Sequence, residues 1–151
     1  MKPPHILLID DEAITLANLT HVLQREGYQV TACKDGAAAL AALSQGHFDL
    51  VITDLKMPGL NGMEVLRRTC AEHPDVPVIM ITGHATLDSA VEAMKAGAFH
   101  YLAKPFRLAE AREVVRSALE FARIKRENRE LKLQVEQLKN QHSIITQDLA
   151  M

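Results

Sequence analysis

The chain has 151 residues, enough for about one domain with an appendage, and its 48% apolar and 24% charged residues allow a buried core. Seventeen basic and nineteen acidic side chains give a formal net charge of -2, which does not favour a nucleic acid or an anionic membrane as partner. These numbers exclude an extended or disordered protein.

The amino end carries one lysine before a short apolar run at residues 5–9. That run is too short for a signal peptide or a membrane span. The two cysteines, Cys33 and Cys70, lie far apart without the spacing of a zinc site, so we expect buried, reduced thiols. The sequence therefore predicts a cytoplasmic protein that does not contact a membrane.

Short apolar runs alternate five times with segments of helical period. This alternation is typical of an α/β fold with a doubly wound parallel sheet and helices on both faces. We expect strands at residues 5–9, 29–33, 50–53, 78–81 and 99–102. We expect helices at residues 13–26, 36–44, 62–72, 86–96 and from 107 onward, with glycine caps near Gly27, Gly46 and Gly97.

Polar side chains follow the apolar runs where the strands should end. Asp10 and Asp11 follow the first run, and Asp54 follows the third. Thr82 follows the fourth run, and Lys104 follows the fifth. Because the carboxyl ends of parallel strands meet at one edge of a sheet, these groups should lie together. Neighbouring carboxylates repel one another unless a cation intervenes, and an all-oxygen set of ligands suits Mg²⁺ shared with phosphate.

This set of residues is suited to phosphoryl transfer. The carboxylate of Asp54 can attack phosphorus and form an aspartyl phosphate, while Lys104 and Thr82 can stabilise phosphoryl oxygens. A simpler interpretation stays open for each residue. Acidic residues at strand ends often only cap the next helix, and single lysines and threonines after strands often serve the local backbone.

Four separated motifs resemble the receiver domain of two-component response regulators over about residues 4–120. The motifs are Asp10-Asp11, the run from Asp54 through Asn61-Gly62, the Thr82-Gly83 pair, and the segment from Tyr101 to Phe106. The resemblance implies a flavodoxin-type or CheY-like sheet with strand order 2-1-3-4-5.

The resemblance also implies a role for each site residue. Asp54 is then the phosphoacceptor for a sensor histidine kinase. Asp11, Asp54 and the backbone carbonyl of Lys56 are the implied direct ligands of Mg²⁺, and Asp10 is implied to help through water. On this basis the chain is a regulatory domain and not a turnover enzyme.

The remaining motif residues are implied to form a switch. Thr82 and Lys104 contact the phosphoryl group, and Thr82 moves toward it. The ring of Tyr101 then turns into the vacated space and alters the face made by the fourth helix, fifth strand and fifth helix. The Lys104–Pro105 peptide bond is expected to be cis.

The last third of the chain continues the fifth helix without glycine or proline. A helix from residue 108 to 142 would extend on the order of 50 Å, too far for one small domain to cover. Its apolar residues follow a heptad repeat, which predicts a homodimer through a parallel two-stranded coiled coil; a solvated linker helix is the alternative. Positions a are Phe121, Asn128, Val135 and His142, and positions d are Ile124, Leu131, Leu138 and Ile145.

A long helical linker after a receiver is similar to NtrC-like regulators that activate sigma-54 RNA polymerase, and residues 143–151 faintly resemble the start of their AAA+ ATPase domain. We therefore expect a receiver at 1–120, a coiled-coil linker at 121–142 and a tail at 143–151, as a fragment of a longer transcription regulator. This segment is not expected to bind nucleic acid directly.

Two other functions stay open. One is a phosphatase or phosphotransferase that turns over an aspartyl phosphate, although Lys56 occupies the position where dehalogenase-like hydrolases carry a second aspartate. The other is a dimerisation scaffold that has lost signalling.

Overall fold

The computed structural model describes the backbone of residues 2–150 and the side chains of residues 2–140. Its five strands form one parallel sheet in the order β2-β1-β3-β4-β5, which confirms the expected fold class and strand order. The strands are β1 (His5–Ile9), β2 (Gln29–Cys33), β3 (Leu50–Asp54), β4 (Val78–Thr82) and β5 (His100–Ala103).

Strands β3, β4 and β5 each end one residue later than expected. Asp54 is the last residue of β3, and Thr82 is the last residue of β4. Both side chains therefore leave from regular strand backbone, which fixes their direction more firmly than a loop would. Strand β5 begins at His100, one residue later than expected.

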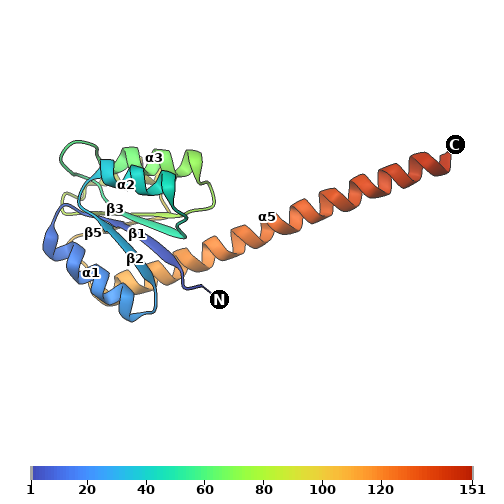
Figure 1. Cartoon of the computed structure of the whole chain (residues 1–151). Coiled ribbons are helices and arrows are strands. Elements are labelled where there is room, and N and C mark those ends of the chain that lie inside the picture. The colour runs from blue at the N-terminus through green and yellow to red at the C-terminus, as the bar shows by residue number, and fades with distance from the viewer. Residues whose placement is uncertain (1, 151) are drawn as a thin grey trace.

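Helices cover both faces of the sheet (Figure 1). Residues of α2, α3 and α4 pack on one face, and residues of α1 and α5 pack on the other. The helices are α1 (Ala13–Arg25), α2 (Gly36–Gln45), α3 (Gly62–Glu72), α4 (Leu87–Lys95) and α5 (Leu108–Ala150).

The alternation of side chains along β1 shows how the two-layered core arises. Leu7 and Ile9 belong to the core beneath α2 and α3, whereas Ile6 and Leu8 belong to the core beneath α1 and α5. All four side chains are fully buried. Because successive strand residues point to opposite faces, a wholly apolar strand supplies both cores at once, and each large aliphatic side chain contributes about 1.5–3 kcal/mol.

The helix ends agree in part with the expected glycine caps. Gly27 and Gly97 follow α1 and α4 with φ of 93° and 109°, the left-handed conformation of a helix-terminating glycine. Gly46 differs, because it follows α2 with extended backbone at φ -124°. At the amino ends, Asp35 and Asn61 accept hydrogen bonds from the backbones of α2 and α3.

Helix α5 continues far beyond the sheet that its first turns cover (Figure 1). Ala118 and Ala122 are buried against the domain, and the small side chains let the helix pack closely. Within the described residues, no helix has an apolar stretch long enough to cross a membrane. The side chains of His142 and Ile145, and of the predicted tail at 143–151, lie outside those that the structure describes.

The base of the domain holds α5 through contacts that the sequence did not suggest. Arg126 Nη2 donates to Asp49 Oδ1 at 2.8 Å, and Arg129 Nη1 donates to Asp75 Oδ2 at 2.6 Å. The Phe121 ring lies against Phe99, with 5.3 Å between the centroids. Residues 121–129 of α5 are thus held against the domain on one side of the helix.

Gly62 provides a test of how tightly the site is built. A Cβ atom on Gly62 would lie 2.0 Å from the carbonyl oxygen of Asp54, which is backbone and cannot move aside easily. We expect Gly62→Ala to lower the free energy of unfolding by about 1–3 kcal/mol, measured by urea denaturation. Gly83→Ala is the control, because a Cβ atom there meets nothing within 4 Å. An equal loss in both variants would contradict this assignment.

Candidate functional site

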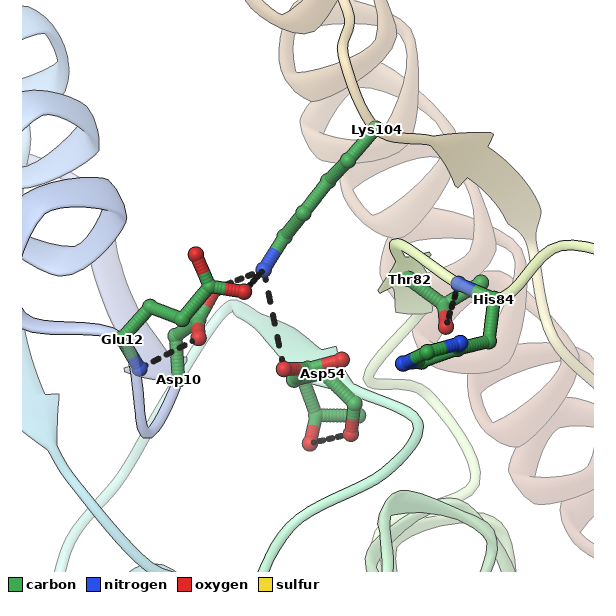
Figure 2. Close-up of polar contacts among 7 residues, drawn as sticks. Asp10, Glu12, Asp54, Thr82, His84 and Lys104 are labelled. Atoms are coloured by element: carbon green, nitrogen blue, oxygen red, sulfur yellow. Dashed lines mark hydrogen bonds and ion pairs between the residues drawn. The ribbon is translucent and has the colours of Figure 1, made fainter.

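The site lies where the carboxyl ends of β1 and β3 meet the segment that follows β5 (Figure 2). Lys104 Nζ lies 2.9 Å from Asp10 Oδ2, 3.0 Å from Glu12 Oε1 and 3.6 Å from Asp54 Oδ2. One ammonium group therefore contacts three carboxylates: Asp54 ends β3, and Asp10 and Glu12 lie between β1 and α1. The expected convergence of Asp10, Asp54 and Lys104 is confirmed as geometry.

The two strand-end carboxylates are buried. Asp10 has no exposed surface, and Asp54 is 4% exposed. Asp10 Oδ1 accepts a hydrogen bond from the backbone N–H of Glu12 at 2.9 Å, which holds its other oxygen toward Lys104. Glu12 is the N-cap residue of α1, but its side chain does not cap the helix. The capping interpretation is therefore wrong for Glu12. Asp10 accepts the Glu12 N–H but also pairs with Lys104, so a local backbone contact is not its sole role.

Burial makes Asp54 hard to ionise. Burial, reinforced by the negative charge of Asp10, raises its pKa to about 7, although the Lys104 ammonium acts in the opposite direction. Hydrogen bonding with the carboxyls of Asp11 and Asp10 raises the pKa further. A second cation beside Asp54 would offset the charge of Asp10 and favour the ionised Asp54 carboxylate.

The same surroundings keep Lys104 ionised. Burial lowers the pKa of Lys104, but its hydrogen bonds to Asp10 and Glu12 and the charges of Asp10 and Asp54 outweigh that effect, so the net pKa is raised. The ammonium therefore stays charged at neutral pH. It is a fixed positive group beside the Asp54 carboxylate.

The donor set fits a hard divalent cation. Carboxylate oxygens of Asp10, Glu12 and Asp54 all lie within 4.8 Å of one another. Asp10 Oδ2 is buried, and its charged contact is Lys104 Nζ at 2.9 Å. All-oxygen sets that include carboxylates are what Mg²⁺ binds in proteins. The residues present therefore fit Mg²⁺.

The predicted metal ligands differ in their exposure to solvent. Asp11 is exposed and is not part of the cluster formed by Asp10, Glu12 and Asp54. Lys56 lies in the loop after β3 with its side chain exposed. The sequence prediction omitted Glu12 from the cluster, although it directly follows Asp10-Asp11 and the acidic run itself was the available sign.

Thr82 and Tyr101 occupy separate positions. Thr82 is fully buried, and its Oγ1 accepts a hydrogen bond from the His84 N–H at 3.0 Å (Figure 2). The Tyr101 hydroxyl lies 2.7 Å from Ser89 Oγ on α4, so its half-buried ring is tied to that helix. The Lys104–Pro105 peptide bond is cis, as the resemblance implied.

The predicted seam on α5 is exposed to solvent. The side chains of Ile124, Leu131, Val135 and Leu138 lie at least about a third of a turn from Arg126 and Arg129 at 100° per residue, whereas the Phe121 ring packs against Phe99 of the domain. Asn128 is exposed among them. The exposed fractions are 46% for Phe121, 47% for Ile124, 57% for Leu131, 48% for Val135 and 64% for Leu138.

Comparison with known proteins shows the family of this chain. The model of the response regulator receiver domain matches residues 6–116. The nitrogen assimilation regulatory protein NtrX of Azorhizobium caulinodans is 37% identical over 142 residues, covering 93% of this chain and 30% of that protein. The chain thus spans less than a third of this relative.

Solved structures of response regulators are also similar to this chain. NtrX from Brucella abortus, crystallised with ADP, has a TM-score of 0.80 at 34% identity over 85% of this chain and 30% of that chain. The response regulator TrrA from Thermotoga maritima, in complex with Mg²⁺-BeF, has a TM-score of 0.70 at 33% identity over 76% of this chain and 98% of that chain.

The raised pKa of Asp54 predicts how stability depends on pH. Between its ordinary value of 3.8 and about 7, the folded carboxyl keeps a proton that the unfolded carboxyl has lost. The contribution of this group to stability is therefore present at low pH and falls as pH rises through that window. In metal-free buffer we expect Asp54→Asn to be more stable than the parent by about 2 kcal/mol at pH 8, and by much less near pH 4.

Urea unfolding with a chelator present measures this difference. Glu136→Gln serves as control, because that side chain is exposed on α5 and should not change the pH dependence. A pH-independent gap between Asp54→Asn and the parent would contradict a raised pKa.

Proposed function

Because this chain belongs to the response regulator receiver domain family, we propose that it is the phosphorylation-controlled input of a two-component transcription regulator and that Asp54 is its phosphoacceptor. The observation that carries the proposal is the placement of the Asp54 carboxylate at a strand end, 3.6 Å from the Lys104 ammonium. The donor is a sensor histidine kinase in this proposal.

The proposed reaction is a phosphoryl transfer without turnover. An oxygen of the ionised Asp54 carboxylate attacks phosphorus, the P–N bond of the donor phosphohistidine breaks, and the imidazole leaves with the electron pair. Lys104 pairs with the extra negative charge on the phosphoryl oxygens, because its ammonium is held in place by Asp10 and Glu12. Thr82 is the proposed hydroxyl donor to a phosphoryl oxygen.

Mg²⁺ is the proposed cofactor. Asp11, Asp54 and the Lys56 carbonyl are its proposed direct ligands, with Asp10 acting through water, and the close placement of Glu12 adds a further carboxylate. When bound, the ion supplies positive charge that offsets both the carboxylates and the phosphoryl oxygens.

The proposed switch runs from Thr82 to Tyr101. A phosphoryl group draws the buried Thr82 hydroxyl away from the His84 N–H that it now contacts. The Tyr101 ring then turns inward and gives up its contact with Ser89 Oγ. Ser89 also forms the capping box of α4 with the N-cap residue Thr86. Loss of its contact with Tyr101 therefore changes the surface that α4 presents.

Phosphoryl labelling tests the acceptor. We expect one equivalent of acid-stable, base-labile label from acetyl phosphate and Mg²⁺, and none in Asp54→Asn. Lys104→Met should bind beryllofluoride with Mg²⁺ at least about tenfold more weakly, because one charge-assisted contact is lost. Arg107→Met is the control, because it removes an exposed cation three residues further along the chain. Labelling of Asp54→Asn, or continuous phosphate release from small esters, would contradict the proposal.

The remaining chain is proposed to act in dimerisation and output. We assign residues 1–120 to the receiver, 121–142 to a coiled-coil linker and 143–151 to the start of an AAA+ domain of a longer regulator. The proposed output is transcriptional and of the sigma-54-dependent type, in the cytoplasm; similarity to NtrX, a nitrogen assimilation regulatory protein, supports a regulatory role. The exposed seam on α5 supports a homodimer in which phosphorylation alters how the receivers pack.

The seam can be tested against a matched position on the same helix. Leu131→Glu with Leu138→Glu should convert the dimer to monomer, because both charges would be buried between the helices. Leu133→Glu is the control: Leu133 is 56% exposed but lies off the seam, on the side of Arg129. Sedimentation equilibrium measures the mass. If both variants sediment like the parent, the seam is not the contact.

A further inference from the structure

We propose that Glu12 is the counter-ion of the Lys104 ammonium in the unphosphorylated protein, and that a phosphoryl group on Asp54 displaces it. The inference rests on the proposed phosphoacceptor role of Asp54 and deepens it. It makes Glu12 a positioning residue, which sets how readily Lys104 becomes available to the phosphoryl oxygens.

Lys104 lies closer to the carboxylates that follow β1 than to the proposed acceptor. Its Nζ is 2.9 Å from Asp10 Oδ2 and 3.0 Å from Glu12 Oε1, but 3.6 Å from Asp54 Oδ2 (Figure 2). The contact with Glu12 is a hydrogen bond that the ammonium donates. A phosphoryl group on Asp54 must therefore compete with ion pairs that already hold the ammonium.

The two carboxylates that hold Lys104 differ in how easily they can release it. Asp10 has no exposed surface, so loss of Lys104 would leave a buried charge without its cation, which is strongly unfavourable. The Glu12 side chain is 60% exposed, and water can solvate its carboxylate when the ammonium leaves. Exchange of Glu12 therefore requires less free energy than exchange of Asp10.

The backbone and the side chain of Glu12 make separate contacts. Its backbone N–H donates to Asp10 Oδ1 at 2.9 Å, and this bond does not involve the side chain. Glu12 is the N-cap residue of α1, but its side chain accepts no hydrogen bond from the helix. Among the described side chains, its only ion pair is with Lys104. The carboxylate can therefore turn into solvent without disturbing Asp10 or the start of α1.

Removal of this counter-ion should favour an anion at the site. The ion pair stabilises the unphosphorylated state, and that stabilisation is lost when a phosphoryl group takes the place of Glu12. The Glu12 carboxylate also repels the incoming anion. Because an exposed ion pair contributes little, we expect a modest effect, about two- to fivefold in a dissociation constant.

Binding of beryllofluoride to the full chain at saturating Mg²⁺ tests the proposal. We expect Glu12→Gln to bind beryllofluoride about two- to fivefold more tightly than the parent, measured by isothermal titration calorimetry. Glu12→Asp keeps the negative charge, but its side chain is one methylene shorter and is suited to capping α1. It should lose the contact with Lys104 and should also bind more tightly than the parent. A separate Mg²⁺ titration verifies saturation in each variant.

Glu110→Gln is the matched control, because it removes the same charge from an exposed position in the first turn of α5. It should bind beryllofluoride like the parent. Circular dichroism and thermal unfolding verify that each variant is folded. A crystal structure of the parent with beryllofluoride and Mg²⁺ gives a direct readout, in which Lys104 Nζ should keep its contact with Asp10 and exchange Glu12 for a fluoride.

Each result has a separate meaning. Tighter binding by both Glu12 variants, with Glu110→Gln unchanged, supports the inference. Equal or weaker binding by Glu12→Gln overturns it, as does a contact between Lys104 and Glu12 that persists in the complex. A loss of Mg²⁺ affinity that prevents saturation makes Glu12 a metal ligand and also overturns it.

A gain in Glu12→Gln that Glu12→Asp lacks, or that Glu110→Gln shares, is a general effect of charge and likewise overturns the inference. If the parent binds beryllofluoride, these negative results leave the proposed function standing. A parent that binds none overturns both.

Discussion

The contact of the Lys104 ammonium with three carboxylates is the interaction on which the rest of the site depends. Without it, two buried carboxylates and one exposed one would repel across a few ångströms at the edge of the sheet. Lys104 does not fully compensate, since the pKa of Asp54 stays raised to about 7. The remaining negative charge is the electrostatic reason why a cation would be favoured at this site, and the Lys104 ammonium is the group that an anionic phosphoryl group would meet.

The framework around this contact is stiff where the chemistry requires it. Asp54 and Thr82 end two adjacent central strands that are buried along their whole length, and both faces of the sheet are packed by helices. The turn below Asp54 has no room for even a methyl group at Gly62. Tyr101 lies on the edge strand β5, where its hydroxyl contacts Ser89 of α4. A rigid acceptor beside an adjustable edge is what a local chemical change needs to alter a distant surface.

One side of helix α5 packs against the domain, and the other side is exposed. Small and apolar residues of its first turns complete the core, and then Arg126 and Arg129 attach the next turns to the base of the domain. The opposite side carries an apolar seam that the described part of the chain leaves exposed. One continuous helix carries both sides, and the structure shows no break in it between the core and the seam.

The sequence alone determined the fold class, most element boundaries and the membership of Asp10, Asp54 and Lys104 in one site. Periodicity and the rule that parallel strands share a carboxyl edge are local and topological, so they can be read from one chain. Tertiary structure decided the rest. Glu12 joins the cluster, and Asp11 stays exposed, because the backbone turn after β1 sets which side chains point inward. Arg126 and Arg129 meet Asp49 and Asp75 across long separations in sequence, and such pairings depend on where the helix lies in space, which the pattern of charges along it does not encode.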